Sequence, residues 1–432
     1  MPAPTSPLLL AAHRDLATGT LLGSALGDTI GLYTEFLSAS SSLAAYPTRR
    51  FTLTPTPTTF HPDLHRLSKP PRHWTDDTDH ALLLLLAYLH TSSLPTQQDL
   101  ASRLRIWVQQ GLRPLNTMPL GLGRLVGTVV ATKGFDVDPE AVARKYWVDT
   151  GKRVAPNGSL MRTHPLGVMC IWEEEEVAFR AAAKFSRATH VDPRCVVACV
   201  IGTGLVRGLV RGEVRSETEI DGVVERGRAW FIAQGGDEEL DADELERHVR
   251  AQSLEELKLD EAAAIGYVYK ALGAGLVVLR LAMRRVGEDG GLWARSRIFE
   301  ELITELVMQG GDADTNACFA GALLGGYLGY GMLPDHWKHG LEHEEWLMEK
   351  VEGLCQVLGL SEGRYDGAKD KDTLPDGGNP ISQAEMEGRW MVLQADVAKK
   401  MEELAKASSS KAKGWPPAGW SLPWQGKDKT KR

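Results

Sequence analysis

Glycine recurs at every fourth position in two apolar segments of the chain. The first stripe is Gly19, Gly23, Gly27 and Gly31, and the second is Gly321, Gly325 and Gly329, preceded by Ala313 and Ala317. Glycine in a helix interior costs about 1 kcal/mol relative to alanine, so a repeated glycine requires a compensating contact. Residues four apart share one helix face, and small residues there let the backbone of a neighbouring helix approach. Each stripe therefore predicts a close helix crossing.

Apolar residues recur at helical spacing along most of the chain. The segments with this pattern are 11–36, 79–90, 97–111, 140–147, 174–185, 194–211, 261–285, 296–308 and 313–330. Period-two alternation is scarce, and 43% of the 432 residues are hydrophobic, which is enough for a sizeable core. We therefore expect an all-α fold, with one large helical domain over residues 12–360.

Polar segments divide this pattern. Residues 37–72 are rich in Ser, Thr and Pro, which predicts a long surface loop, and the acidic residues 212–260 predict a helical insertion. Residues 361–407 are expected to form a linker followed by an amphipathic helix that docks on the domain. The basic residues 408–432 are expected to be disordered.

Composition limits the partners. A net charge of −8 argues against a general nucleic-acid binder, whose surface would be basic. No continuous apolar run approaches the ~18 residues of a membrane span, so no membrane partner is expected. The five cysteines contain no CxxC pair and no secretory signal precedes the domain, which favours an intracellular location, cytoplasmic or nuclear. We expect a monomer.

The stretch "HWTDDTDHALLLL" at 73–85 concentrates acidic residues at the start of an apolar helix. It contains Asp76, Asp77 and Asp79 directly after Thr75. One interpretation is an ordinary helix N-terminus, where acidic residues suit the macrodipole and Thr75 acts as the cap. The other is that a cation binds there.

A second acidic cluster favours the cation. "GGDADTNA" contains Asp312, Asp314 and Thr315 before another apolar helix, and Asp28 and Glu35 lie near the end of the first glycine stripe. Oxygen ligands without Cys or His are those preferred by hard cations, which indicates magnesium, with manganese as an alternative. The two clusters could instead cap helices that lie far apart.

Read together, these segments resemble the ADP-ribosylglycohydrolase family, which includes the dinitrogenase-reductase-activating glycohydrolase and the ADP-ribosyl-acceptor hydrolases. The resemblance covers about residues 12–335. The matching segments, in the family's order, are "GSALGDTIGLYTEF" (23–36), "WTDDTDHALLLL" (74–85), "GLGRLVGT" (121–128), "NGSLMRTHPLG" (157–167), "ATHVDP" (188–193), "IGYVYKALGAGL" (265–276) and "QGGDADTNACFAGALLGGYLG" (309–329).

The resemblance implies an all-α fold with two magnesium ions in a cleft, Mn²⁺ being possible. The implied metal ligands are Thr75, Asp76, Asp77, Asp312, Asp314 and Thr315. Glu35, Asp77 and Asp314 are the implied catalytic carboxylates, although Glu35 could be an ordinary exposed helix residue. Asp28 is expected to orient a helix end. We also hypothesise that the 37–72 loop is a lid that moves Glu35 toward or away from the metals.

Substrate contacts are implied for a further set of residues. They are Gly121, Gly123, Asn157, Gly158, Ser159, His190 and Tyr267. Backbone N–H groups of the Asn157 loop, at a helix N-terminus, suit a diphosphate. A buried histidine and a core aromatic are the alternatives for His190 and Tyr267.

The implied reaction is magnesium-dependent hydrolysis of the glycosidic bond between ADP-ribose and an acceptor, reversing ADP-ribosylation. The acceptor could be a protein side chain, poly(ADP-ribose) or O-acetyl-ADP-ribose. One alternative is a catalytically weak ADP-ribose-binding or structural relative, like the family's lens crystallins, which tend to lose metal ligands. Another is a magnesium-dependent phosphohydrolase, whose nucleophile and phosphate-binding lysine pattern has no counterpart in this sequence.

Overall fold

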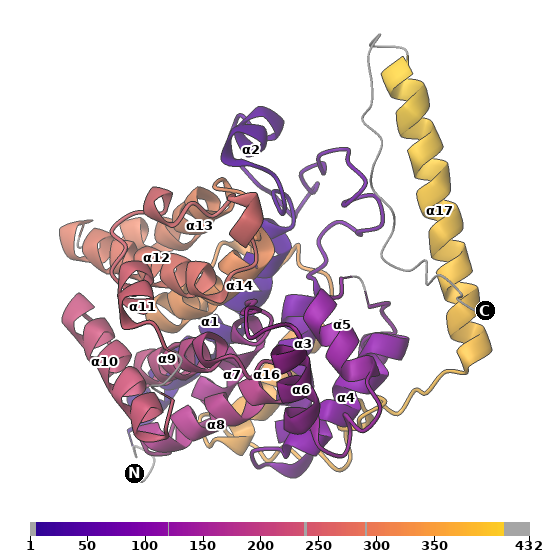
Figure 1. Cartoon of the computed structure of the whole chain (residues 1–432). Helices are drawn as coiled ribbons and strands as arrows, with labels where there is room; N and C mark the ends of the chain where they lie inside the picture. Colours follow the sequence, from indigo (N-terminus) through magenta and orange to yellow (C-terminus); the bar gives the residue numbers. More distant parts are fainter. Residues whose placement is uncertain (1–5, 120, 237–239, 290–291, 410–432) are drawn as a thin grey trace. The chain divides into compact units, whose positions relative to one another are not determined.

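A computed structural model describes residues 6–119, 121–236, 240–289 and 292–409 of the chain. Within these ranges the fold is all-α, as expected, and β pairing is limited to the isolated bridges Ser38–Gly310 and Pro156–Tyr267 (Figure 1). The α-helices are α1 (Pro7–Gly31), α2 (Ala39–Ala45), α3 (Asp76–Thr91), α4 (Gln97–Gln110), α5 (Arg124–Ala131), α6 (Pro139–Asp149), α7 (Leu160–Met169), α8 (Glu175–Arg187), α9 (Pro193–Val210), α10 (Glu217–Ala233), α11 (Ala242–Val249), α12 (Val268–Asp289), α13 (Leu292–Val307), α14 (Ala313–Leu328), α15 (Asp335–Lys338), α16 (Glu344–Val357) and α17 (Gln383–Ser409). Short 3₁₀ helices are η1 (Arg113–Leu115), η2 (Glu255–Leu257), η3 (Ala262–Ala264), η4 (Tyr330–Met332) and η5 (Lys371–Thr373).

The chain divides into two compact units. The larger consists of residues 1–61 and 69–382, and the smaller of 62–68 and 383–432. The smaller unit contains α17, so the predicted C-terminal helix is present, and Lys400 Nζ donates to the carbonyl oxygen of Leu67 at 3.1 Å. Its docking on the larger unit stays a prediction. The predicted disordered tail falls on residues 410–432, which lie outside the described residues.

The two glycine stripes pack against each other. A Cβ on Gly27 would collide with the carbonyl oxygen of Ala317, and one on Gly23 would collide with that of Gly321. Gly31 opposes Asp314 in the same way, so α1 and α14 run antiparallel with their backbones in contact. The close crossing predicted from the sequence is confirmed. It brings the C-terminal end of α1 to the N-terminal end of α14.

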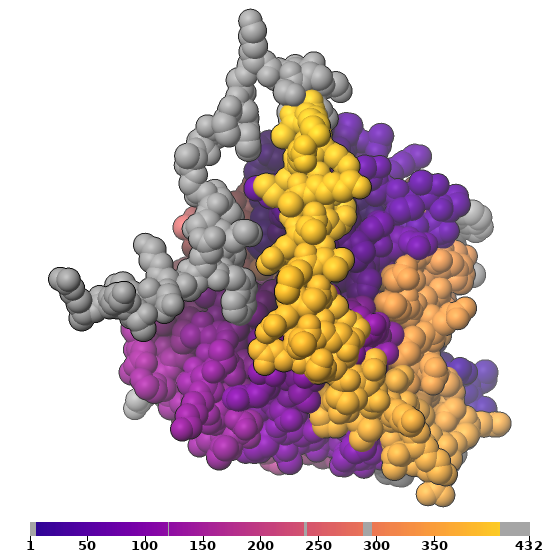
Figure 2. Space-filling model, turned by 90° about the vertical axis from the view of Figure 1, so that its right-hand side faces the viewer, coloured from indigo at the N-terminus to yellow at the C-terminus, as the bar shows by residue number. Residues whose placement is uncertain are grey.

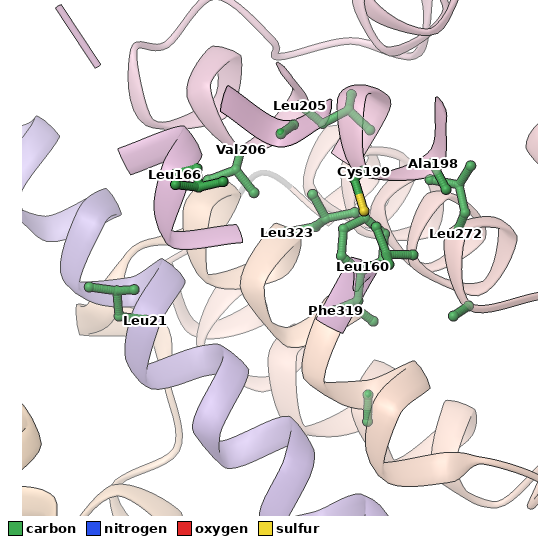
Figure 3. Close-up of a cluster of buried hydrophobic side chains, with 14 of the residues drawn as sticks. Leu21, Leu160, Leu166, Ala198, Cys199, Leu205, Val206, Leu272, Phe319 and Leu323 are labelled. Atoms are coloured by element: carbon green, nitrogen blue, oxygen red, sulfur yellow. The ribbon is translucent and has the colours of Figure 1, made fainter. Parts of the chain in front are cut away.

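α9 is the central helix of the larger unit and packs against α1, α7, α8, α10, α12 and α14. Figure 3 shows Cys199 of α9 among Leu160 of α7 and Phe319 and Leu323 of α14. The one helix in the described residues that is long and apolar enough to cross a membrane is α9, and 89% of it is buried within the protein. Its sequence is not one continuous apolar run, because polar and glycine residues are scattered through it.

Residues 37–72 differ from the predicted surface loop. They begin with α2, and Tyr46, Phe51 and Leu53 are buried. Tyr33, just after α1, packs its ring against those of Tyr46 and Phe51, with centroids 5.9 and 5.2 Å apart. These few aromatic anchors in a Ser/Thr/Pro-rich background attach the first part of the segment to the core.

Residues 361–380 are not a free linker. Lys350 of α16 is 1% exposed and its Nζ lies 2.6 Å from Asp370 and 2.8 Å from Asp372. Thr373 is buried and hydrogen-bonds His90 Nδ1 of α3 at 2.9 Å. In Figure 2 the orange C-terminal part of the larger unit lies beside the purple surface of earlier residues. Polar composition suggested a linker, but Asp370 and Asp372 form ion pairs with the buried Lys350.

Candidate active site

Asp28 joins α1 to the start of α3. Its buried carboxylate accepts hydrogen bonds from the backbone N–H of Thr75 at 3.0 Å and from that of Thr78 at 3.0 Å. The Thr78 hydroxyl donates a third, at 2.6 Å. Asp28 thus takes up N–H groups that the first turn of α3 leaves unpaired, which agrees with the expected role at a helix end.

Two sets of three carboxylate side chains, called the two carboxylate groups below, lie where α1, α3 and α14 converge. One oxygen from each of Asp28, Asp77 and Asp314 lies within 4.8 Å of the others, and the same holds for Glu35, Asp312 and Asp314. Asp314 belongs to both groups. The oxygens of each group are close enough together to hold a metal ion.

Threonines complete the cluster. The Thr75 hydroxyl donates to Asp77 Oδ2 at 3.1 Å and lies 3.5 Å from Asp314 Oδ2, so it connects the two acidic segments. The backbone N–H of Thr315 donates to Asp314 Oδ1 at 2.9 Å. All the acidic and hydroxyl residues that the sequence singles out as ligands therefore come from two helix starts that face each other.

Backbone pairing fixes Glu35 beside Asp312. The Phe36 N–H donates to the Gly311 carbonyl at 2.6 Å, and the Gly311 N–H donates to the Leu37 carbonyl at 2.9 Å. Gly310 and Gly311 have φ of +69° and +72°, and a Cβ on either would collide with a carbonyl oxygen. Glu35 is buried. The structure therefore disfavours a lid that swings Glu35 away from the cluster.

Burial and mutual repulsion disfavour the ionised forms of the clustered carboxylates. Burial raises the pKa of Asp76 to about 7, and burial followed by the nearby Glu35 raises the pKa of Asp312 to about 6. Burial, and then neighbouring carboxylates, raise the pKa values of Asp77 and Asp314 well above their usual range. Each raised pKa means that the ionised carboxylate is destabilised where it lies.

One atom indicates what would relieve this repulsion. Asp77 Oδ1 is buried and has no hydrogen-bond partner among the described residues. A buried carboxylate oxygen without a donor is costly, and a cation would satisfy it. Oxygen-only ligands, mutual repulsion and this orphan oxygen fit a hard divalent cation.

Asp79 is different, although it belongs to the same acidic run. Its Oδ1 accepts from the indole N–H of Trp74 and its Oδ2 from that of Trp107, both at 2.8 Å. The carboxylate is therefore part of the core packing of α3, and it faces away from the two groups.

A polar loop borders the cluster on the side of Asp312. Asn157 Nδ2 donates to Asp312 Oδ2 at 2.9 Å, and the Asn157 N–H donates to the Gly266 carbonyl at 3.0 Å. This pairing continues as the Pro156–Tyr267 bridge, so Tyr267 lies on the same border. A Cβ on Gly158 would lie 3.1 Å from His190 Nε2. Four of the predicted substrate contacts therefore lie next to the carboxylate group that contains Asp312. They are Asn157, Gly158, His190 and Tyr267.

Comparison with known proteins identifies the family of the chain. The family model for ADP-ribosylglycohydrolase matches residues 9–366. The chain belongs to the ADP-ribosylglycohydrolase family. A solved structure described as an "ADP-ribosylglycohydrolase-related protein complex" is 25% identical over 80% of this chain and 98% of its own, with a TM-score of 0.49. No curated protein matches the chain. Membership supports hydrolysis of ADP-ribose linkages as the general activity.

The other predicted substrate contacts of this glycohydrolase lie away from the Asn157 loop or point away from it. They are Gly121, Gly123 and Ser159. A Cβ on Gly121, which has a φ of +121°, would collide with Asp76 Oδ1, so Gly121 borders the first acidic segment. Gly123 precedes α5, and a Cβ there would meet nothing within 4 Å. Ser159 points into the core, where its Oγ accepts from Ser186 Oγ at 3.1 Å and from Cys199 Sγ at 3.3 Å. Only its backbone is on the loop side.

Lys69 is a charged neighbour of the site that the sequence did not predict. The same Cβ on Gly121 would lie 3.4 Å from Lys69 Nζ, so the ammonium group is close to Asp76. Its charge opposes the rise in the pKa of Asp76 caused by burial. Lys69 follows a Ser/Pro-rich stretch with no helical period, and nothing in the sequence connects it with the acidic helix start. The glycohydrolase site is therefore acidic at its centre and has a cation at its border.

Proposed function

We propose that this chain hydrolyses the glycosidic bond at C1″ between ADP-ribose and an acceptor, using two divalent cations, Mg²⁺ or alternatively Mn²⁺. The observation that carries the proposal is the pair of carboxylate groups that share Asp314. The first cation would be held by Thr75, Asp76 and Asp77 and the second by Asp312 and Thr315, with Asp314, which belongs to both groups, contacting both cations. Bound there, the cations would supply positive charge for the ribose hydroxyls and for lowering the pKa of a water.

The protein's own carboxylates suit the chemistry of this bond. Glycosidic cleavage passes through an oxocarbenium-like transition state, in which the sugar becomes positive. Asp77 and Asp314 are ionised when cations are bound, and their negative charge favours that state. Glu35 is 6% exposed and belongs to the group with Asp312 and Asp314, so it is our candidate for the base that takes a proton from the attacking water.

The loop before α7 is our candidate for the diphosphate site. It ends at the N-terminus of α7, where backbone N–H groups and the helix dipole favour anions. Neither Gly158 nor Ser159 uses its N–H in a hydrogen bond to the described residues. Asn157 already contacts Asp312, so a diphosphate on this loop would leave the distal ribose beside the second acidic group.

Product analysis tests the proposal. Purified protein would be incubated with ADP-ribosyl-arginine, ADP-ribosyl-serine, poly(ADP-ribose) and O-acetyl-ADP-ribose, with Mg²⁺ and then with EDTA. Release of free ADP-ribose from at least one substrate, lost in EDTA and restored by Mg²⁺, is expected. ADP-ribose binding without release from any of the four would identify an inactive relative, and AMP as the product would identify a pyrophosphatase. Either result would overturn the proposal.

A further inference from the structure

A short chain of hydrogen bonds runs from a buried arginine to His190. Arg162 of α7 donates from Nη2 to the Thr189 hydroxyl at 2.6 Å and to the Phe185 carbonyl at 3.0 Å. The Thr189 hydroxyl lies 2.7 Å from His190 Nδ1. All three side chains are buried, with exposed fractions of 0%, 1% and 2% for Arg162, Thr189 and His190. None of these contacts involves the acidic cluster.

The chemistry of the three groups fixes the direction of each bond. A guanidinium can only donate, so the Thr189 hydroxyl accepts from Arg162. The hydroxyl has one proton of its own, and His190 Nδ1 is its only further partner among the described residues. Buried hydroxyls donate where an acceptor is within reach, so the proton points to Nδ1. Nδ1 is then the acceptor, and the neutral ring carries its proton on Nε2.

The surroundings keep the ring neutral. Burial, and then the positive charge of Arg162, lower the pKa of His190 well below its usual range. A neutral imidazole has one donor and one acceptor, and here the acceptor faces inward. The donor therefore faces the other way, toward Gly158, whose added Cβ would lie 3.1 Å from Nε2.

We propose that Thr189, oriented by Arg162, is a positioning residue that holds His190 as its Nε2–H tautomer, so that this N–H binds an oxygen of the substrate diphosphate at the Asn157–Gly158 loop. The inference rests on the proposed function, since it takes ADP-ribose as the ligand. It explains why Arg162, a buried arginine with no carboxylate partner among the described residues, lies behind the loop: Arg162 sets the direction of the Thr189 hydroxyl. Because the tautomer is fixed before binding, less free energy is spent on ordering the imidazole when the ligand binds.

The tautomer can be measured directly in the full-length protein. Histidine labelled with ¹⁵N gives distinct shifts for protonated and unprotonated ring nitrogens, and the His190 signals are assigned by their loss in His190→Gln. The expected result is an unprotonated Nδ1 and a protonated Nε2 in the free protein. A protonated Nδ1 in the free protein would overturn the proposal. This readout needs neither substrate turnover nor metal.

Matched variants test the consequence for binding. Thr189→Val removes the hydroxyl and keeps the shape, while Thr189→Ser restores a hydroxyl. ADP-ribose affinity, measured by calorimetry, is expected to fall about fivefold or more in Thr189→Val, the effect of losing one oriented hydrogen bond, and to stay near the parental value in Thr189→Ser. The His190 signals should show mixed tautomers only in Thr189→Val.

Thr203→Val is the control, because Thr203 is an equally buried threonine whose hydroxyl donates to the Thr163 carbonyl at 3.3 Å. It should bind ADP-ribose like the parent. An equal loss in Thr203→Val and Thr189→Val, or parental affinity in Thr189→Val, would contradict the role of Thr189. Failure of the proposed hydrolysis would appear as absent turnover in the parent, with the tautomer and ADP-ribose affinity unaffected.

Discussion

Asp314 is the residue on which the two carboxylate groups depend. It lies at the start of α14, opposite Gly31, and it shares one group with Asp77 and the other with Glu35. Repulsion from both sides and burial destabilise its ionised form. We therefore expect Asp314 to lower the stability of the protein without cations and to be required for binding them.

The change Asp314→Asn separates these two effects. Turnover is expected to fall at least about 100-fold, and Mg²⁺ should no longer raise the melting temperature, because a shared anionic ligand is lost. The EDTA-treated variant should melt at or above the parental temperature, because one repelling charge is removed. Calorimetric melting with Mg²⁺ and with EDTA measures the two melting temperatures, and the product assay measures turnover.

The control is Asp79→Asn, which changes a neighbouring carboxylate that holds two indole N–H groups. It should lower stability by about 1–3 kcal/mol, because one indole loses its acceptor, while the response to Mg²⁺ remains. Substantial turnover in Asp314→Asn at saturating Mg²⁺ would show that Asp314 is not a ligand.

The raised pKa values also predict how pH affects cation binding. An acid with a higher pKa in the folded protein than in the unfolded chain binds more protons when folded, so its contribution to stability falls as pH rises from about 4 through its folded pKa. The folded pKa values are about 7 for Asp76 and about 6 for Asp312. Mg²⁺ competes with these protons.

The rise in melting temperature caused by Mg²⁺ should therefore grow between about pH 5 and about pH 8. Thermal melts at constant ionic strength, with Mg²⁺ and with EDTA, give this difference at each pH, and effects common to both samples cancel. A Mg²⁺ effect that is constant over this range would mean that the carboxylates are ionised throughout, contrary to the raised pKa values.

At the scale of elements, the antiparallel α1–α14 crossing creates the site. The glycine stripes predict it from sequence, because repeated helical glycines have few other uses. The end of α1 is less predictable: its pattern runs to residue 36, but the helix stops at Gly31, and Phe36 has a φ of +60°. The pairing of residues 36–38 with Gly310 and Gly311 determines that end, and these two glycines lie about 270 positions further along the chain.

Gly27→Val tests the crossing. The new side chain would meet the Ala317 backbone, which cannot rotate away, so we expect a loss of about 3 kcal/mol in the free energy of unfolding. Gly287→Ala in α12 is the matched control, since a Cβ there meets nothing within 4 Å, and it should be neutral or stabilising by up to about 1 kcal/mol. Denaturant melts compare the two. Equal midpoints for Gly27→Val and the parent would exclude backbone contact at Gly27.

In the molecule as a whole, sequence motifs predicted which residues lie close together, but they did not predict the direction of every side chain. The helix class and the candidate acidic ligands are predicted from local patterns, and the family model over residues 9–366 shows the family. The inward direction of Ser159, the approach of Lys69 and the anchored residues 361–380 depend on contacts between distant segments. Local composition carries no signal for such contacts.

We propose that the two carboxylate groups bind two cations, both of which contact Asp314. Anomalous diffraction from crystals grown with Mn²⁺ tests it most directly, because Mn²⁺ suits the same oxygen ligands and is visible by its own scattering. Two anomalous peaks are expected, one beside Asp77 and one beside Asp312, both in contact with Asp314. No peak in either group at saturating Mn²⁺, or a peak without contact to Asp314, would contradict the claim.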